Sequence, residues 1–106
     1  MKISLITVTH NSEKYLEDCI QSVLKQTYKN IEHIIIDGSS TDSTVSIIER
    51  YSRHLSQWKS ESDNGMYHAI NKGMSLATGD VIGLLNFVAG LPNTATAANI
   101  RRTARR

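Results

Sequence analysis

Polar side chains gather at four places along the chain, each directly after an apolar run that predicts a β-strand. The first place is Thr9-His10-Asn11, the second begins at Asp37, the third is Asp63-Asn64-Gly65 and the fourth is Asn86. In an open parallel sheet the carboxyl ends of the strands lie at one edge, and polar ligands bind beyond that edge. The sequence therefore predicts one polar binding site built from residues that lie far apart in the chain.

Asp37 has the most specific chemistry of this set. A carboxylate at a strand end can accept two hydrogen bonds from the edge of a nucleotide base or from a ribose. The small residues at positions 38–40 let the backbone turn closely around such a ligand. An ordinary turn uses the same residue types, and Asp42 has the type of a helix cap. Spacing alone leaves ligand contact and turn formation open as alternatives for Asp37.

Strands and helices must alternate in order to position these residues. Segments rich in β-branched and apolar residues predict strands at residues 2–9, 31–36, 55–60 and 81–85. The intervening segments predict helices at residues 12–28, with Ser12 as the cap, from 42 or 43 to 51, and 66–77. This alternation predicts an α/β fold with a parallel sheet and right-handed crossovers.

Composition and charge restrict the class of protein. A chain of 106 residues with 40% hydrophobic and 21% charged residues is typical of one small globular domain. A single cysteine excludes an internal disulfide framework and a CxxC-type zinc site, and a lone free thiol is typical of a cytoplasmic protein. No run approaches the roughly 20 apolar residues of a membrane-spanning helix.

Charge divides the chain into two parts. Residues 1–86 carry eight Lys or Arg against ten Asp or Glu, whereas residues 87–106 carry four Arg and no acid. We expect a folded unit over residues 1–86 and an irregular, disordered basic tail over residues 87–106. Because the body is acidic and no aromatic residue lies among the arginines, nucleic-acid binding is not expected.

Two phosphate-binding motifs are absent. The chain contains neither GxGxxG nor GxxxxGK[ST], so neither a dinucleotide-binding Rossmann site nor a P-loop is indicated. A nucleotide bound at the predicted sheet edge would need another kind of contact.

Two long segments carry a resemblance to a known family. They are SLITVTHNSEKYLEDCIQSVLKQTYKNIEHIIIDGSSTDSTVSII and SDNGMYHAINKGMSLATGDVIGLLN, and they cover about residues 2–86. In this order they resemble the start of a family 2 glycosyltransferase, such as the bacterial enzymes of capsule, exopolysaccharide and lipopolysaccharide assembly. The resemblance implies the nucleotide-binding half of a GT-A fold. It also implies inverting transfer of a sugar from a nucleotide-sugar, usually UDP-linked, to a polysaccharide or lipid-linked acceptor.

The resemblance also implies residue roles on the nucleotide side. It places Thr9, His10 and Asn11 against the base, has Asp37 hydrogen-bond the base, usually uracil, and places Asp63 near the nucleotide. His10 either stacks on the base or is a plain loop residue.

Two further residues lie on the helix predicted to border the donor site. The resemblance places Asn71 and Lys72 there. Lys72 either approaches the diphosphate or is a solvated surface lysine.

The metal motif of the family is missing. Relatives hold Mg²⁺ or Mn²⁺ with an Asp-Asp or Asp-x-Asp motif directly after the strand that matches residues 81–86. Here Asn86 is followed by Phe87-Val88-Ala89, and no acidic residue occurs after Asp80. We therefore expect no metal ligand, no catalytic base and no acceptor half, as in a truncated or frameshifted chain that is inactive alone. The alternative is a noncatalytic nucleotide-binding or interaction module.

Two expectations about association follow from the resemblance. Relatives order these strands 3-2-1-4, so residues 81–85 would form an exposed apolar edge that invites self-association or pairing with another chain. The expected location is the cytoplasm, with peripheral attachment to the inner face of the membrane as the alternative.

Overall fold

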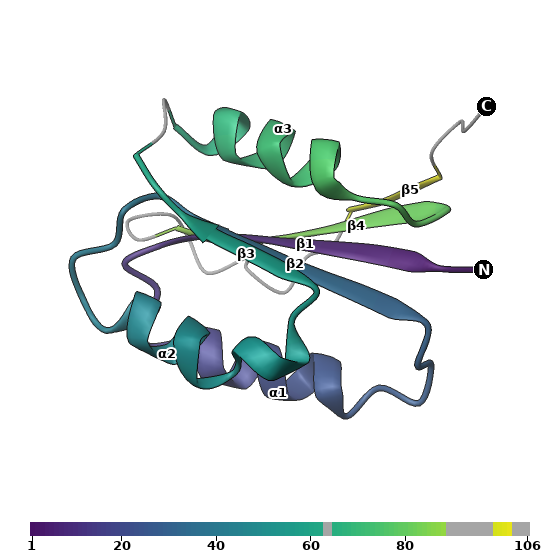
Figure 1. The fold of residues 1–106 in the computed structure, drawn as a ribbon, viewed down its shortest axis with the longest axis horizontal. Coiled ribbons are helices and arrows are strands. Elements are labelled where there is room, and N and C mark those ends of the chain that lie inside the picture. Colours follow the sequence, from purple (N-terminus) through teal and green to yellow (C-terminus); the bar gives the residue numbers. More distant parts are fainter. Residues whose placement is uncertain (63–64, 89–98, 103–106) are drawn as a thin grey trace.

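The computed structural model describes residues 1–62, 65–88 and 99–102. The strands are β1 (Ile3–His10), β2 (Ile31–Asp37), β3 (Gln57–Ser60), β4 (Val81–Val88) and β5 (Asn99–Arg102). The helices are α1 (Leu16–Leu24), α2 (Thr44–Arg50), the short 3-10 turn η1 (Ser52–His54) and α3 (Met66–Leu76). Figure 1 shows α3 on one face of the sheet and α1 and α2 on the other. None of the described helices is long and apolar enough to cross a membrane.

The sheet confirms the predicted α/β architecture. Its strand order is β3-β2-β1-β4-β5, and β1 pairs in parallel with both β2 and β4. Strand β3 adds in parallel to β2, so the carboxyl ends of β1 to β4 lie at one edge. The predicted 3-2-1-4 order is therefore correct.

Both faces of the sheet carry a buried apolar core, to which β1 contributes on the α3 face and β2 on both faces. Toward α3 the buried residues are Ile6, Val8, Ile34, Ile36, Ala69 and Ile82, and toward α1 and α2 they are Leu16, Ile20, Ile35, Ile47 and Ile48. Helix α3 lies very close to the sheet, because a Cβ atom added at Gly73 would lie 2.5 Å from Cγ2 of Ile6.

The first helix begins later and ends earlier than its sequence pattern predicts. The carbonyl of Ser12 accepts the N–H groups of Tyr15 and Leu16, both at 3.0 Å, so Ser12 begins a turn and α1 starts at Leu16. The predicted side-chain cap at Ser12 is therefore wrong. At α2, predicted to be capped by Asp42 or Ser43, the N-cap position is Ser43, whose side chain makes no capping hydrogen bond. Oδ1 of Asp42 accepts the Thr44 N–H at 2.9 Å from one residue before the cap.

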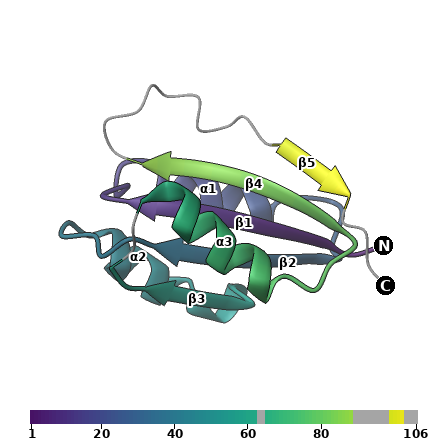
Figure 2. The same ribbon diagram turned by 90° about the horizontal axis from the view of Figure 1, so that it is seen from above.

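The C-terminal edge differs from the prediction. Strand β4 continues to Val88, and β5 pairs antiparallel with residues 81–84 (Figure 2). The expected exposed edge is therefore wrong over residues 81–84, and residues 99–102 are a strand rather than part of an irregular tail. The backbone N–H and C=O groups of an edge strand can pair with any extended segment. A four-residue strand that pairs in this way therefore needs no periodic sequence pattern from which it could be predicted. Residues 89–98 and 103–106 lie outside the described residues.

Candidate functional site

Asp37 is the central hydrogen-bond acceptor of the sheet edge. Its side chain is 0% exposed. Oδ1 accepts from the hydroxyls of Thr9 and Ser40, both at 2.6 Å. Oδ2 accepts from the Ser40 N–H at 2.9 Å and from the Ser60 hydroxyl at 2.8 Å. Because an ionised carboxylate has about four lone-pair positions, these donors fill all of them. Asp37 therefore joins the ends of β1, β2 and β3, and its contact with a base stays a prediction.

The loops that follow β1 and β2 are hydrogen-bonded to each other. The Asn11 N–H donates to the Ser40 hydroxyl at 2.8 Å, and Oδ1 of Asn11 accepts the Thr41 N–H at 2.8 Å. Nδ1 of His10 lies 2.7 Å from the carbonyl oxygen of Gly38. A carbonyl can only accept, so Nδ1 carries the proton in this bond, and Nε2 of the neutral ring carries a lone pair.

Two residues of these loops have left-handed backbone conformations. Asn11 has φ of 50° and Ser39 has φ of 51°, and neither is glycine. Such conformations cost about 1–2 kcal/mol each for residues with a Cβ atom, and they persist where neighbouring contacts hold them. The hydrogen bonds between the two loops supply such contacts, and strained backbone of this kind is typical of ligand sites.

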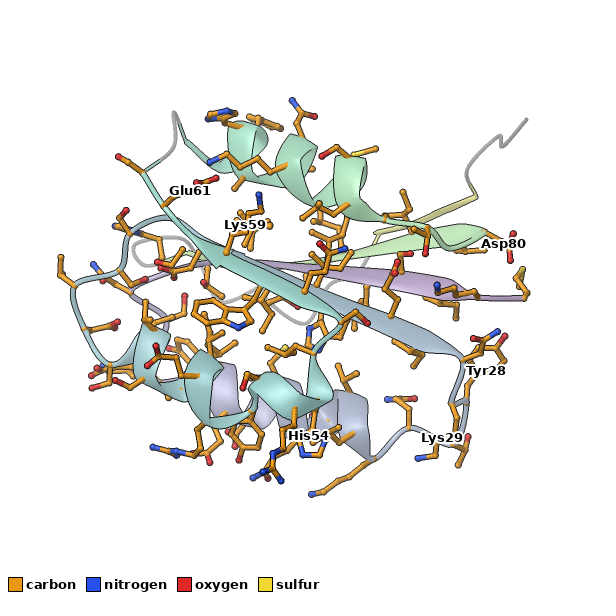
Figure 3. The ribbon with its side chains drawn as sticks, viewed as in Figure 1. Tyr28, Lys29, His54, Lys59, Glu61 and Asp80 are labelled. Carbon is orange, nitrogen blue, oxygen red and sulfur yellow. The ribbon has the colours of Figure 1, made fainter. Side chains whose placement is uncertain are left out.

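A second group of charged side chains lies beside this corner. Glu61 follows β3, and its N–H donates to the Asp37 carbonyl oxygen at 3.0 Å. Nζ of Lys72, on α3, lies 2.9 Å from Oε1 of Glu61. The hydrogen bond and charge of Lys72 lower the pKa of the Glu61 carboxyl, and the nearby charges of Lys59 and His68 lower it further. Figure 3 shows Lys59 and Glu61 in the space between β3 and α3.

The structure brings together most of the residues predicted for the site. Thr9, His10, Asn11 and Asp37 meet at one corner. Lys72 pairs with Glu61, which follows β3 and whose backbone N–H bonds the Asp37 carbonyl. Asn71 is exposed on α3, and Asp63 lies outside the described residues. Sequence reasoning missed Ser60 and Glu61, because their approach to Asp37 depends on the parallel register of β2 and β3, which the sequence does not give.

The described residues do not fit the divalent metal that the resemblance implies. No three His, Cys, Asp or Glu side chains gather into a possible metal site within residues 1–62, 65–88 and 99–102. Strand β4, after which the resemblance implies an acidic motif, continues through Phe87 and Val88. We therefore assign no step to a metal on these residues.

Comparison with known proteins gives one consistent family. The sequence pattern of glycosyl transferase family 2 matches residues 4–86. An uncharacterized glycosyltransferase of Mycobacterium tuberculosis is 38% identical over 85 residues, which is 79% of this chain and 32% of that protein. Glycosyltransferase GlyG of Streptococcus pneumoniae is 34% identical over 87 residues, which is 79% of this chain and 29% of that protein. The chain thus spans about a third of the length of these relatives.

Solved structures of glycosyltransferases also resemble this chain over part of their length. The crystal structure of TarS from S. aureus in complex with UDP-GlcNAc matches with a TM-score of 0.74 and 30% identity, over 81% of this chain and 26% of that one. A mannosyltransferase from Pyrobaculum calidifontis, in complex with GDP-Man and Mn²⁺, matches with a TM-score of 0.73 and 25% identity, over 80% of this chain and 27% of that one. The sequence match, the relatives and the GT-A architecture agree, and the chain belongs to glycosyl transferase family 2.

Proposed function

We propose that this chain forms the donor-nucleotide half of a glycosyltransferase and binds the nucleotide of a UDP-sugar at the carboxyl edge of β1 and β2. The observation that carries this proposal is the pair of strand-end loops, which are hydrogen-bonded to each other and hold two non-glycine residues at positive φ. Family membership and the nucleotide-sugars bound by TarS and the mannosyltransferase support the ligand class.

The residues at the carboxyl edge have different proposed roles in nucleotide binding. Asp37 fixes the loops and is itself saturated, so it acts as a positioning residue. The His10 ring, held through Nδ1 by the Gly38 carbonyl, offers a flat face and Nε2 to the base. Lys72 supplies positive charge for the diphosphate.

The transfer step needs groups that we do not assign to the described residues. In an inverting transfer, an acceptor hydroxyl attacks the anomeric carbon, the bond to the nucleoside diphosphate breaks, and a general base takes the hydroxyl proton. No described carboxylate of the edge is both unpaired and placed for that proton, because Asp37 is saturated and Glu61 pairs with Lys72. We therefore assign donor binding to these residues and leave the acceptor, a polysaccharide or lipid-linked sugar, to the rest of the enzyme.

Nucleotide binding by the whole chain tests this proposal. Isothermal titration calorimetry with UDP should give saturable binding, and the His10→Ala variant should bind at least about tenfold more weakly, since stacking on one base contributes about 1–3 kcal/mol. His54→Ala is the matched control, because His54 is exposed in η1 and contacts Tyr51, which follows α2. Equal UDP affinity in the two variants, or no UDP binding by the parent at millimolar concentration, would refute the proposal.

A further inference from the structure

The Glu61–Lys72 ion pair lies directly after β3, where the Glu61 N–H bonds the Asp37 carbonyl. We propose that the Glu61 carboxylate competes with the donor's diphosphate for the ammonium group of Lys72. Lys72 pairs with Glu61 before the donor binds, and its Nζ passes to the phosphate oxygens afterwards. This inference rests on the proposed function, because it assigns the diphosphate to the same edge.

The backbone of Glu61 is bonded to the sheet edge, whereas its carboxylate is bonded to a side chain of α3. The Glu61 N–H donates to the carbonyl of Asp37, whose side chain is the centre of the loop network. The Glu61 side chain is 49% exposed, and within the described part of the chain its carboxylate pairs with Lys72. Its carboxylate can therefore rotate toward solvent without disturbing the corner that holds the loops.

Lys72 reaches the Glu61 carboxylate from α3, the helix that covers this face of the sheet. It extends from α3, and its side chain is only 21% exposed, so its aliphatic stem is packed and its ammonium group is directed to the edge. An ion pair that is half exposed contributes little to stability and is easily exchanged for another anion. A diphosphate offers more negative charge and more acceptor oxygens than one carboxylate does, so the exchange favours the ligand.

The surroundings of the pair favour an anion larger than one carboxylate. Lys59 lies on β3 between Trp58, which packs against the core of α1 and α2, and Ser60, which bonds Asp37. Because side chains alternate along a strand, Lys59 is directed to the α3 face, where Figure 3 shows it near Glu61. Lys59 and Lys72 together carry one more charge than the Glu61 carboxylate neutralises, so the group formed by these three side chains has a net positive charge.

The inference predicts an effect that depends on phosphate. Glu61→Gln keeps the size of the side chain and removes the competing charge. UDP and inorganic pyrophosphate should then bind about two- to fivefold more tightly, the range of an exposed ion pair, while uridine affinity stays unchanged. Lys72→Met should weaken UDP binding, and the double variant should lose the gain that Glu61→Gln gives alone. Glu49→Gln is the matched control, because Glu49 is exposed on α2 and its substitution makes the same charge change.

Calorimetric titration of the parent and these variants with uridine, UDP and pyrophosphate separates the possible outcomes. If uridine and UDP bind but Glu61→Gln leaves the UDP affinity equal or weaker, the competition is refuted while the proposed function stands. If uridine and UDP do not bind, yet Glu61→Gln still tightens pyrophosphate through Lys72, the anion exchange stands and the proposed function fails. If Glu49→Gln tightens UDP equally, a general charge effect explains the gain and overturns the inference.

Discussion

Replacing Asp37 by asparagine and by alanine separates two roles for this residue, a scaffold of the loops and a direct ligand of the base. Asparagine keeps the shape of the side chain. If its amide lies with Nδ2 in the position of Oδ1, it donates to the hydroxyl oxygens of Thr9 and Ser40. Its carbonyl oxygen then accepts the Ser40 N–H and the Ser60 hydroxyl, so all four contacts are retained.

The expected loss of stability follows from these contacts. Hydrogen bonds to an ionised group are about twice as strong as neutral ones, but removing the charge also removes the cost of burying it, so Asp37→Asn should cost only about 1 kcal/mol. Asp37→Ala leaves the Ser40 N–H without this acceptor and three hydroxyls without theirs. Each lost bond to a charged group is worth about 1.5–3 kcal/mol, and after partial rescue by water we expect a total of about 3 kcal/mol or more.

Urea unfolding followed by circular dichroism measures both losses, and UDP titration of the folded asparagine variant measures the other role. A scaffold predicts that Asp37→Asn binds UDP within about threefold of the parent, whereas a direct contact to the base predicts a loss of at least about tenfold. Two results would refute the scaffold: equal destabilisation by asparagine and alanine, or loss of UDP binding in an asparagine variant of nearly parental stability.

Two further predictions concern the core. Gly73→Ala should destabilise the fold by about 1–3 kcal/mol in urea unfolding, because its Cβ would lie 2.5 Å from Cγ2 of Ile6; an unchanged midpoint would show that α3 shifts freely. Burial lowers the pKa of His33 to about 4 from 6.5, so the unfolded chain binds the extra proton between these values and stability falls as pH falls. Between pH 7 and pH 5 the protonation of His33 in the unfolded chain should lower the free energy of unfolding by about 2 kcal/mol. A His33→Gln variant that keeps this pH dependence would show that His33 is not its cause.

The sequence was sufficient to predict the sheet because its strands are short, apolar and separated by clear helical periods. The β-branched and apolar runs indicated the strands, and their alternation with helices indicated a parallel sheet with right-handed crossovers. The strand order 3-2-1-4 came from the family resemblance. Strand β5 could not be predicted in this way. Four residues that add to an existing edge through backbone hydrogen bonds need no pattern of their own, so the expected open edge at residues 81–84 was wrong.

The candidate site was predictable in its location and less so in its chemistry. Strand ends indicated where Thr9, His10 and Asp37 would meet, because parallel strands align their carboxyl ends. The number of donors around Asp37 was not readable from the chain, since one of them, Ser60, comes from a strand 23 residues away. The pairing of Lys72 with Glu61 depends equally on how α3 lies over β3.

The saturation of Asp37 changes where specificity for a donor should be sought. If a loop has to become ordered when a ligand binds, the entropic cost of that ordering lowers the affinity for the ligand. A buried carboxylate with four donors removes that ordering cost, but it does so by using every lone pair that could have touched the ligand. Under the proposed function, recognition then falls to groups that the scaffold leaves accessible, for which we propose the His10 ring at the base end and Lys72 at the phosphate end. Variation at those two positions should therefore alter nucleotide preference with little change in stability, whereas variation at Asp37 should alter stability first.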